Sequence, residues 1–398
     1  MYASKVPSLT YFQESRETLL SWGVMQDTQL EIISDTVFTI ITAVDLYNAT
    51  DVHVVPRPGP SNGRGDSRMF FRHAGKLQLA QNWAGLTDAD GVLIDGLSLE
   101  KLKEAVFRTA KPSPPVKVIR TGKRQIRARL LHSRYSERLI LRFQPRTPPP
   151  ISEAFKGTPM LIESLRRATG LIVICGPQGA GKSTLASSLV ELWANDRRHI
   201  ATIEDPVEYL IEPAFGIVTP VEASFHKADV DGLTPLDNAL REVQCADVDG
   251  LFIGEIRTGR DMLRTLNVCG ASEPVVITLH ARSILDALLR MLNLINEHMD
   301  EETARRTLSQ CIDTILYVDL AYTKEGKPVP VVLSAPFTTN SIRKNIAEGA
   351  RANMLQALTT AFEGGMLPGT IRREAAIDNA KRAGATDASI TAALPPGV

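Results

Sequence analysis

The sequence predicts an α/β protein of two domains: a mixed α+β N-terminal domain, then a domain built on a mainly parallel sheet that ends in a helical appendage. The chain has 398 residues, more than one typical domain, so two separate hydrophobic cores are expected. In its second half, short apolar segments at 171–175, 199–203, 250–253 and 274–279 alternate with helical stretches. That alternation is typical of a parallel sheet covered by helices.

A proline-rich segment at 145–150 is the predicted connection between the domains. Four prolines within six residues form a stiff connector that interrupts strand pairing. We therefore expect an N-terminal domain over 1–144, a second domain over 151–349 and the appendage over 350–398.

The N-terminal domain is predicted to contain one amphipathic helix and several strands. A helical face is marked by Val37, Ile40, Ile41, Val44 and Tyr47. Strands are expected at 52–54, at 69–77 with a turn at Gly75, at 116–119 and within 130–143.

Lys and Arg are concentrated between residues 101 and 146, where Glu104 and Glu137 are the only carboxylates. A solvated sheet face, arginines directed at phosphate and a nucleic-acid surface are three interpretations of this segment. The segment shows no regular interleaving of aromatic residues with the charges, and the whole chain balances 45 basic against 45 acidic residues. Nucleic acid is therefore not an expected partner.

The appendage is predicted to hold two helices. Leu355, Leu358 and Phe362 recur at helical spacing before a glycine pair, and a second, polar helix follows. Its polar balance favours a docking element rather than a core.

The positions of the cysteines and the hydropathy of the chain exclude several classes of protein. Cys175, Cys245, Cys269 and Cys311 form no CxxC pair, so neither a zinc ribbon nor a disulfide framework is expected. The sequence contains no signal-peptide core and no stretch of about 18 apolar residues. We expect a cytoplasmic protein without a membrane span of its own, which reaches a membrane through partners.

The segment from Gly176 to Thr184 completes the phosphate-binding pattern GxxxxGK[ST] between an apolar strand and a helix. Its residues are Gly176, Pro177, Gln178, Gly179, Ala180, Gly181, Lys182, Ser183 and Thr184. The glycines allow backbone N–H groups to approach phosphate oxygens, Lys182 would reach the β- and γ-phosphates, and Ser183 would hold Mg²⁺. Bound nucleoside triphosphate is the predicted ligand.

Polar residues follow three other predicted strands. Glu204 and Asp205 follow one strand, Glu255 follows the next, and His280 ends a third. Because ligands of parallel sheets bind outside the carboxyl ends of the strands, these side chains are expected to meet the phosphates. Phosphoryl transfer to water needs one group to position the water and another to hold the metal. His280 is either a hydrogen-bonded structural residue or a group that senses the γ-phosphate.

In this order, the segments GPQGAGKST, TIEDPVEY, GLFIGEIR and TLHA resemble the Walker A, Asp, Walker B and His boxes of the type II and type IV secretion and pilus-retraction ATPases. In the first domain, 49–53 is similar to that family's ASDLH segment and 71–77 to its RxxGxL hairpin. The resemblance covers residues 30 to 335.

The resemblance implies a homo-hexameric ring in which a PAS-like N-terminal domain and a RecA-like domain clamp ATP and Mg²⁺. It implies that Glu204 is the general base, that Glu255 acts at the metal and the lytic water, and that His280 senses phosphate. The family arginines that reach ATP from the N-terminal domain match Arg127 and Arg142.

Several departures from the family pattern indicate which subgroup of the family the chain resembles. Ala271-Ser272-Glu273 stands where many relatives have TGH, no retraction signature is evident at 342–345, and no cysteine-rich insertion is present. The size of the chain and its C-terminal end resemble those of the ATPases of type IVB secretion and conjugative plasmid transfer.

The resulting hypothesis is a cytoplasmic ATPase, peripheral at the inner membrane, that works on membrane proteins of a secretion or conjugation complex. A motor for type IV pilus retraction or assembly, a nucleic-acid-stimulated RecA-like motor, a P-loop kinase for a small molecule, and a slow nucleotide-regulated assembly factor are the alternatives. Glu273 motivates the last of these.

Overall fold

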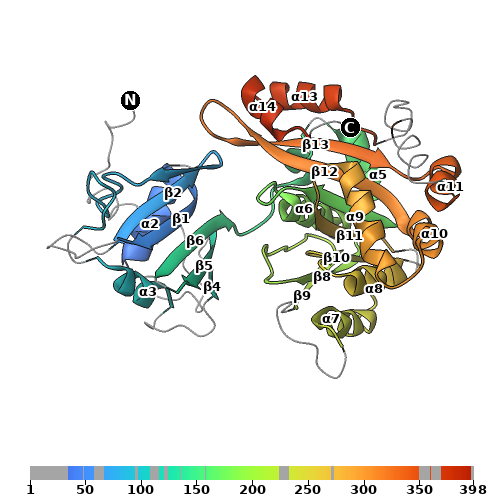
Figure 1. Ribbon diagram of the computed structural model, residues 1–398, viewed down its shortest axis with the longest axis horizontal. Coiled ribbons are helices and arrows are strands. Elements are labelled where there is room, and N and C mark those ends of the chain that lie inside the picture. Colours follow the sequence, from blue (N-terminus) through green and yellow to red (C-terminus); the bar gives the residue numbers. More distant parts are fainter. Residues whose placement is uncertain are drawn as a thin grey trace. The chain divides into compact units, whose positions relative to one another are not determined.

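The computed structural model describes residues 35–47, 49–57, 67–94, 97–107, 116–120, 124–134, 136–156, 158–223, 233–269, 273–348, 359 and 369–395. The chain divides into two compact units, Met1–Arg146 and Thr147–Val398 (Figure 1). The predicted helix around Leu355, Leu358 and Phe362 lies outside the described residues.

The N-terminal unit is a six-stranded antiparallel sheet in the order β3-β2-β1-β6-β5-β4. Its strands are β1 (Ala49–Pro56), β2 (Ser67–His73), β3 (Lys76–Leu79), β4 (Val116–Arg120), β5 (Arg124–His132) and β6 (Glu137–Pro145). Helices α2 (Asp35–Leu46) and α3 (Leu99–Phe107) share one hydrophobic core with the sheet. Alternate strand residues such as Val52, Leu141 and Ile126 enter this core, which leaves the intervening side chains on the opposite face.

The predicted strand within 130–143 is in fact parts of two strands. A tight turn joins β5 to β6, in which the Ser136 backbone N–H donates to Ser133 Oγ and the Ser133 N–H donates to the Ser136 carbonyl. The strand and turn expected at 69–77 correspond to β2, a turn at Ala74 and Gly75 with positive φ, and the start of β3.

The second unit is built on a seven-stranded sheet in the order β13-β12-β7-β11-β10-β8-β9. The strands are β7 (Leu171–Gly176), β8 (His199–Glu204), β9 (Ile217–Glu222), β10 (Gly250–Ile253), β11 (Val275–His280), β12 (Ile312–Tyr322) and β13 (Pro328–Pro336). All neighbours are parallel except β12 and β13. Strands β7 and β10 are buried along their whole length, as expected for strands covered on both faces.

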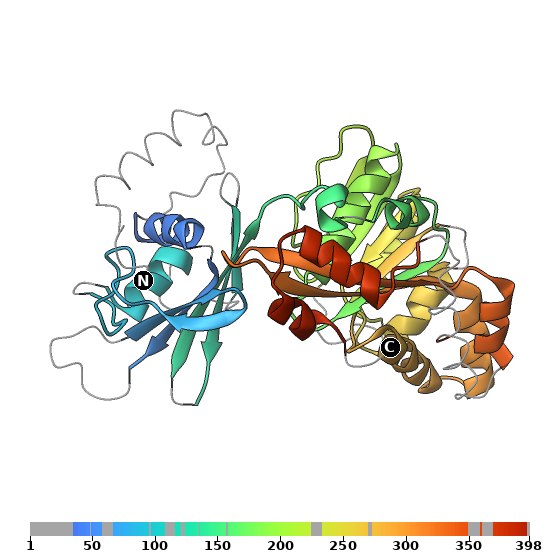
Figure 2. The ribbon, with the colours of Figure 1, turned by 90° about the horizontal axis from the view of Figure 1, so that it is seen from above.

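Helices cover this sheet (Figures 1 and 2). They are α4 (Ile151–Ala154), α5 (Pro159–Arg166), α6 (Lys182–Asn195), α7 (Pro235–Gln244), α8 (Gly259–Cys269), α9 (Ile284–Asn296), α10 (Glu301–Cys311) and α11 (Asn340–Glu348). The two C-terminal helices, α13 (Arg373–Arg382) and α14 (Asp387–Ala393), lie beside β12 and β13. Backbone bridges Ser334–Ile371 and Thr323–Ala385 attach this segment to the edge of the sheet.

The α/β fold class predicted from the sequence is confirmed. The central parallel strands lie where the apolar segments predicted them. Strands β9, β12 and β13 had not been predicted.

Candidate active site

The phosphate loop runs from the end of β7 into α6, and two of its glycines are required by geometry. A Cβ at Gly176 would overlap the Val318 carbonyl oxygen of β12, and backbone atoms cannot move aside to accommodate it. Gly181 has φ of 88°, a left-handed conformation, immediately before the first residue of α6. The loop therefore passes tightly between neighbouring strands and presents the positive N-terminal end of α6 to an anion.

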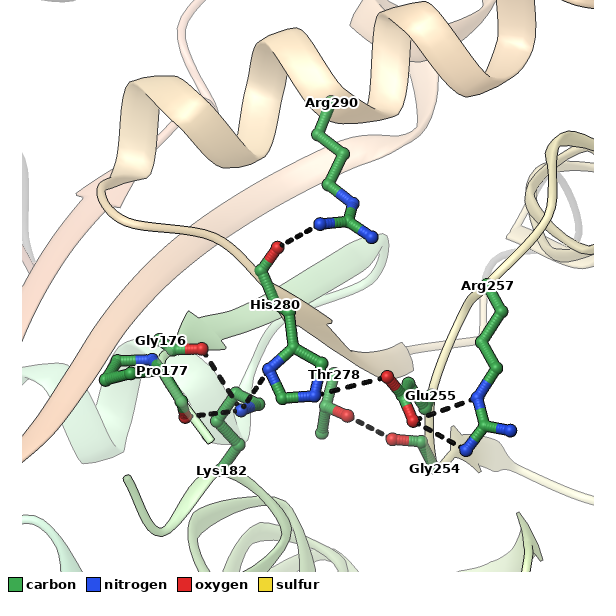
Figure 3. Close-up of polar contacts among 9 residues, drawn as sticks. All are labelled: Gly176, Pro177, Lys182, Gly254, Glu255, Arg257, Thr278, His280 and Arg290. Carbon is green, nitrogen blue, oxygen red and sulfur yellow. Dashed lines mark hydrogen bonds and ion pairs between the residues drawn. The ribbon is translucent and has the colours of Figure 1, made fainter. Parts of the chain in front are cut away.

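Lys182 is the centre of the polar contacts in Figure 3. Its ammonium donates to the carbonyls of Gly176 at 3.1 Å and Pro177 at 2.7 Å, and lies 3.2 Å from Nδ1 of His280. Burial lowers the pKa of Lys182, while the nearby Glu255 carboxylate opposes that shift. The phosphate loop thus contains one buried ammonium that is already connected to the end of β11.

His280 joins Lys182 to Glu255. Its Nε2 lies 3.3 Å from Glu255 Oε1, on the side of the ring opposite the lysine. Burial and, next, the Lys182 charge lower the pKa of His280. A neutral ring whose Nδ1 accepts from Lys182 and whose Nε2–H donates to Glu255 satisfies both contacts.

Further contacts fix the residues at the carboxyl ends of β10 and β11. Arg257 donates to Glu255 Oε2 from Nε at 3.1 Å and from Nη2 at 2.9 Å, and so holds the carboxylate from the side opposite His280. Arg290 of α9 donates to the His280 carbonyl at 2.8 Å, and the Thr278 hydroxyl donates to the Gly254 carbonyl. Charge-assisted hydrogen bonds therefore hold the Glu255 carboxylate after β10 and the backbone at the end of β11.

Glu204 ends β8 and is buried, with 4% of its surface exposed. The Thr202 hydroxyl donates to Oε1 at 2.8 Å, and the Glu208 backbone N–H donates to Oε2 at 3.2 Å. Burial raises the pKa of Glu204 to about 7, although these two hydrogen bonds oppose the shift. A carboxylate with a pKa near neutrality is suited to accept a proton in catalysis.

Glu204 and Glu255 follow residues that are paired in neighbouring strands. Ile203 of β8 is opposite Ile253 of β10, and the Gly254 N–H donates to the Ile203 carbonyl at 2.8 Å. The two predicted acidic groups therefore lie at the same edge of the sheet, one residue apart in register.

Ser183 and Thr184 lie in the first turn of α6. Both are half-buried, and Thr184 Oγ1 lies 2.8 Å from the hydroxyl of Tyr209. Within the part of the chain that the structure describes, no cluster of three His, Cys, Asp or Glu residues could hold a metal ion. Mg²⁺ commonly takes one or two protein oxygens together with substrate phosphates and water, so the Ser183 hydroxyl and the Glu255 carboxylate fit this ion.

The remaining loop residues have backbone roles. Pro177, Gln178 and Gly179 are exposed at the loop surface, and the Pro177 carbonyl accepts from the N–H of the buried Ala180. These contacts shape the concave turn in which backbone N–H groups can bind phosphate.

Arg127 and Arg142 belong to the N-terminal unit and face each other on β5 and β6. The same row of the sheet continues from Arg142 to Asp51 on β1 and then to Arg72 on β2. Arg142 Nε donates to Asp51 Oδ1 at 2.9 Å, and Arg72 Nε lies 3.8 Å from Oδ2. We refer to Arg127, Arg142, Asp51 and Arg72 as the arginine row.

Sequence reasoning missed several side chains with structural roles in these sites, among them Thr202, Tyr209, Arg257 and Asp51. Tyr209 and Arg257 lie within the segments TIEDPVEY and GLFIGEIR, so their proximity to the acidic residues was available as a signal. Thr202 and Asp51 also lie within segments named above, TIEDPVEY and 49–53, but their contacts with Glu204 and Arg142 follow from strand alternation and register. Glu273, which motivated one alternative function, directly precedes the last residue before β11.

Among the described helices, none is both long and apolar enough to cross a bilayer.

Comparison with known proteins places this site in context. The family profile described as "Type II/IV secretion system protein" matches residues 27–325. The Escherichia coli K12 protein YggR, itself described as uncharacterized, is 27% identical over 248 residues, which cover 61% of this chain and 72% of YggR. Type II secretion system protein E of Pectobacterium carotovorum is 33% identical over 187 residues, but these cover 44% of this chain and only 35% of that protein.

A solved structure shares the fold over nearly the whole chain. The X-ray structure of the Legionella pneumophila ATPase DotB superposes with a TM-score of 0.68 and 18% sequence identity, over 93% of this chain and 97% of that one.

Proposed function

Because this chain belongs to the type II/IV secretion system protein family, we propose that it hydrolyses ATP to ADP and phosphate as a homo-hexamer that drives a type IV, and specifically type IVB, secretion or conjugative transfer apparatus. The observation that carries the proposal is the connected set of Lys182, His280 and Glu255 at the phosphate loop, with the buried Glu204 on the neighbouring strand end. A phosphate loop, a metal-compatible carboxylate and a carboxylate with raised pKa are the parts that phosphoryl transfer to water requires.

The nucleotide is held by the loop. Backbone N–H groups from Gly176 to Thr184 and the N-terminal end of α6 neutralise the phosphates, and the Lys182 ammonium exchanges its carbonyl partners for phosphate oxygens. Bound Mg²⁺, held by Ser183 and Glu255, would supply charge neutralisation on the β- and γ-phosphates.

Glu204 accepts the proton in the proposed reaction. A water oxygen bonds to the γ-phosphorus, the bond from that phosphorus to the bridging oxygen breaks, and the proton of the water passes to a Glu204 carboxylate oxygen. Thr202 and Glu208 keep that carboxylate oriented. His280 contributes a neutral ring beside the γ-phosphate, and Arg127 and Arg142 supply cationic charge from an N-terminal unit.

The partners and location follow from the same proposal. The protein works in the cytoplasm at the inner membrane, attached through proteins of the secretion or conjugation complex. The absence of a cysteine-rich insertion and the two C-terminal helices beyond the family match support a type IVB assignment over the type II branch.

Measurement of phosphate release by the purified full-length protein tests the chemistry. We expect Mg²⁺-dependent turnover that Glu204→Gln reduces by about 10²-fold or more, because general-base catalysis contributes about 10²–10⁴-fold. Glu242→Gln, on an exposed position of α7, is the matched control and should retain wild-type turnover. Normal turnover by Glu204→Gln would refute the assigned base, and dependence on an added phosphate acceptor would favour a kinase.

The oligomeric state and the secretion or transfer apparatus are tested in separate experiments. Mass measurement with ATP should give six chains of 43.5 kDa each, and Glu204→Gln should fail to restore secretion or conjugation to a host from which the gene is deleted. Loss of twitching motility alone in the deletion strain would favour the pilus motor, and strong stimulation of turnover by single-stranded DNA would favour a nucleic-acid motor.

A further inference from the structure

Tyr209 lies between β8 and β9, where its ring is buried with 7% of its surface exposed. It belongs to the hydrophobic core of the second unit, and its hydroxyl lies 2.8 Å from Thr184 Oγ1 in the first turn of α6. Burial raises the pKa of Tyr209 to about 12, so the hydroxyl keeps its proton at all physiological pH values. The result is a neutral hydrogen bond between the phosphate-loop helix and the acidic segment after β8.

Each end of this hydrogen bond adjoins a residue of the proposed reaction. Thr184 follows Ser183, whose hydroxyl fits Mg²⁺. Tyr209 follows Glu208, whose backbone N–H donates to Glu204 Oε2. A short series of covalent links and hydrogen bonds therefore runs from the metal end of the phosphate loop to the carboxylate that accepts the proton.

Packing alone does not require this hydroxyl. A phenylalanine would fill the same core volume, whereas a buried hydroxyl needs a hydrogen-bond partner to offset its desolvation. Here the partner belongs to α6, which is separate from Tyr209 along the chain. The hydrogen bond therefore fixes the distance between α6 and the segment after β8, which are not paired as neighbouring strands.

We propose that Tyr209 is a positioning residue whose hydroxyl, through Thr184, holds the segment carrying Glu204 in register with the phosphate loop. This proposal rests on the proposed function, in which Glu204 accepts the proton. In this role Tyr209 acts on the reaction only through the position of Glu204.

The test compares Tyr209→Phe with Tyr47→Phe, which removes a hydroxyl from the aromatic cluster of the N-terminal unit and serves as the matched control. We expect Tyr209→Phe to lower kcat by about 2- to 13-fold, the effect of losing one hydrogen bond of typical net strength. Affinity for ATP should change by less than about twofold, because the loop backbone and Lys182 are untouched.

The pH profile separates positioning from a general loss of stability. Glu204 is surrounded by Thr202, by Glu208 and Tyr209 on its own segment, and by Glu222 of β9, and burial is the main cause of its raised pKa. Loosening this segment admits water, so the acidic limb of the kcat profile should move below that of the wild type in Tyr209→Phe and stay in place in Tyr47→Phe.

A double-mutant cycle with Thr184→Val checks that the effect passes through the named partner. Tyr209→Phe should cost little further kcat in the Thr184→Val background, because the hydrogen bond is already absent. Wild-type kcat and an unmoved acidic limb in Tyr209→Phe would overturn the positioning role while leaving the base assignment intact. Normal turnover by Glu204→Gln would overturn the base and, with it, this proposal.

Discussion

The two units carry their charged side chains in different places, and the type of sheet explains the difference. In the second unit, helices bury both faces of a parallel sheet, so Glu204, Glu255 and His280 occur only where strands end. In the N-terminal unit, an antiparallel sheet uses one face for the core, and the arginine row crosses the opposite face. The position of a polar group is therefore set by where a strand ends in the second unit and by the alternation of side chains along a strand in the N-terminal unit.

The electrostatics of the two regions also differ. At the strand ends of the second unit, burial shifts the pKa of Glu204 upward and those of Lys182 and His280 downward. In the arginine row, one buried carboxylate, Asp51, stands against three guanidinium groups, two of which lie directly opposite each other. The polar groups of the N-terminal unit thus lie in one row across strands, whereas those of the second unit lie at strand ends.

The largest expected effect comes from removing the buried ammonium of the second unit. Lys182→Ala should lower turnover by about 10³-fold or more and abolish retention of nucleotide, because electrostatic stabilisation of a transferring phosphoryl group is the dominant catalytic contribution. Calorimetry with ATP and Mg²⁺ measures binding, and phosphate release measures turnover. Lys344→Ala, on an exposed position of α11, is the control. Tight ATP binding by Lys182→Ala would contradict the assigned phosphate loop.

A smaller effect, in the N-terminal unit, tests whether the arginine row takes part in the reaction at all. Arg142→Ala should lower kcat by about 10²-fold, and Asp51→Asn by about tenfold, since Asp51 orients the guanidinium without contacting nucleotide. If Asp51 acts through Arg142, the double variant should resemble Arg142→Ala alone. Full activity of Arg142→Ala would make the row a structural feature of the sheet face.

The sequence predicted the second unit better than the first for physical reasons. Apolar, β-branched segments and a glycine-rich loop are local patterns, so β7, β8, β10 and β11 and the phosphate loop were all found. Strands β9 and β12 lack that pattern in part: β9 is largely exposed, and β12 follows α10 without any intervening turn residue. The hairpin of β5 and β6 was predicted as one strand because no Asn-Gly or other glycine signal marks the connection between them.

Site residues were predicted as a set, but their contacts were not. Motif order placed Lys182, Glu255 and His280 at one sheet edge, yet the 3.2 Å contact of Lys182 with His280 joins residues 98 positions apart and depends on β7 and β11 being neighbours. The pairing of Arg142 with Asp51 likewise depends on strand register, which spans 91 positions. Such long-range pairings arise from topology, which local sequence patterns do not encode.

Arg257 allows a comparison between a charge that orients a carboxylate of the candidate site and a charge in a surface ion pair outside it. Arg257→Ala should lower kcat by about five- to tenfold and raise the Mg²⁺ concentration needed for half-maximal turnover, because Glu255 loses the two hydrogen bonds that orient Oε2. Arg257→Lys should recover part of the loss, since it restores the charge but not the fork. Arg306→Ala, at an exposed ion pair on α10, is the control. An unchanged Mg²⁺ requirement would mean that Arg257 does not position the carboxylate.

The last expected effect is on stability rather than on turnover, and it depends on pH. The pKa of Glu204 rises from 4.5 to about 7 on folding, so between these values the folded state binds more protons than the unfolded state, and this contribution to stability is lost as pH rises. Burial of ionised Glu204 therefore lowers the free energy of unfolding, and an uncharged side chain of the same shape avoids this loss. Glu204→Gln should match the wild type in free energy of unfolding at pH 5 and exceed it by about 1–3 kcal/mol at pH 8. Urea titrations at both pH values measure this difference, and an equal difference at the two would show that the carboxylate is not held in its charged form at the expense of stability.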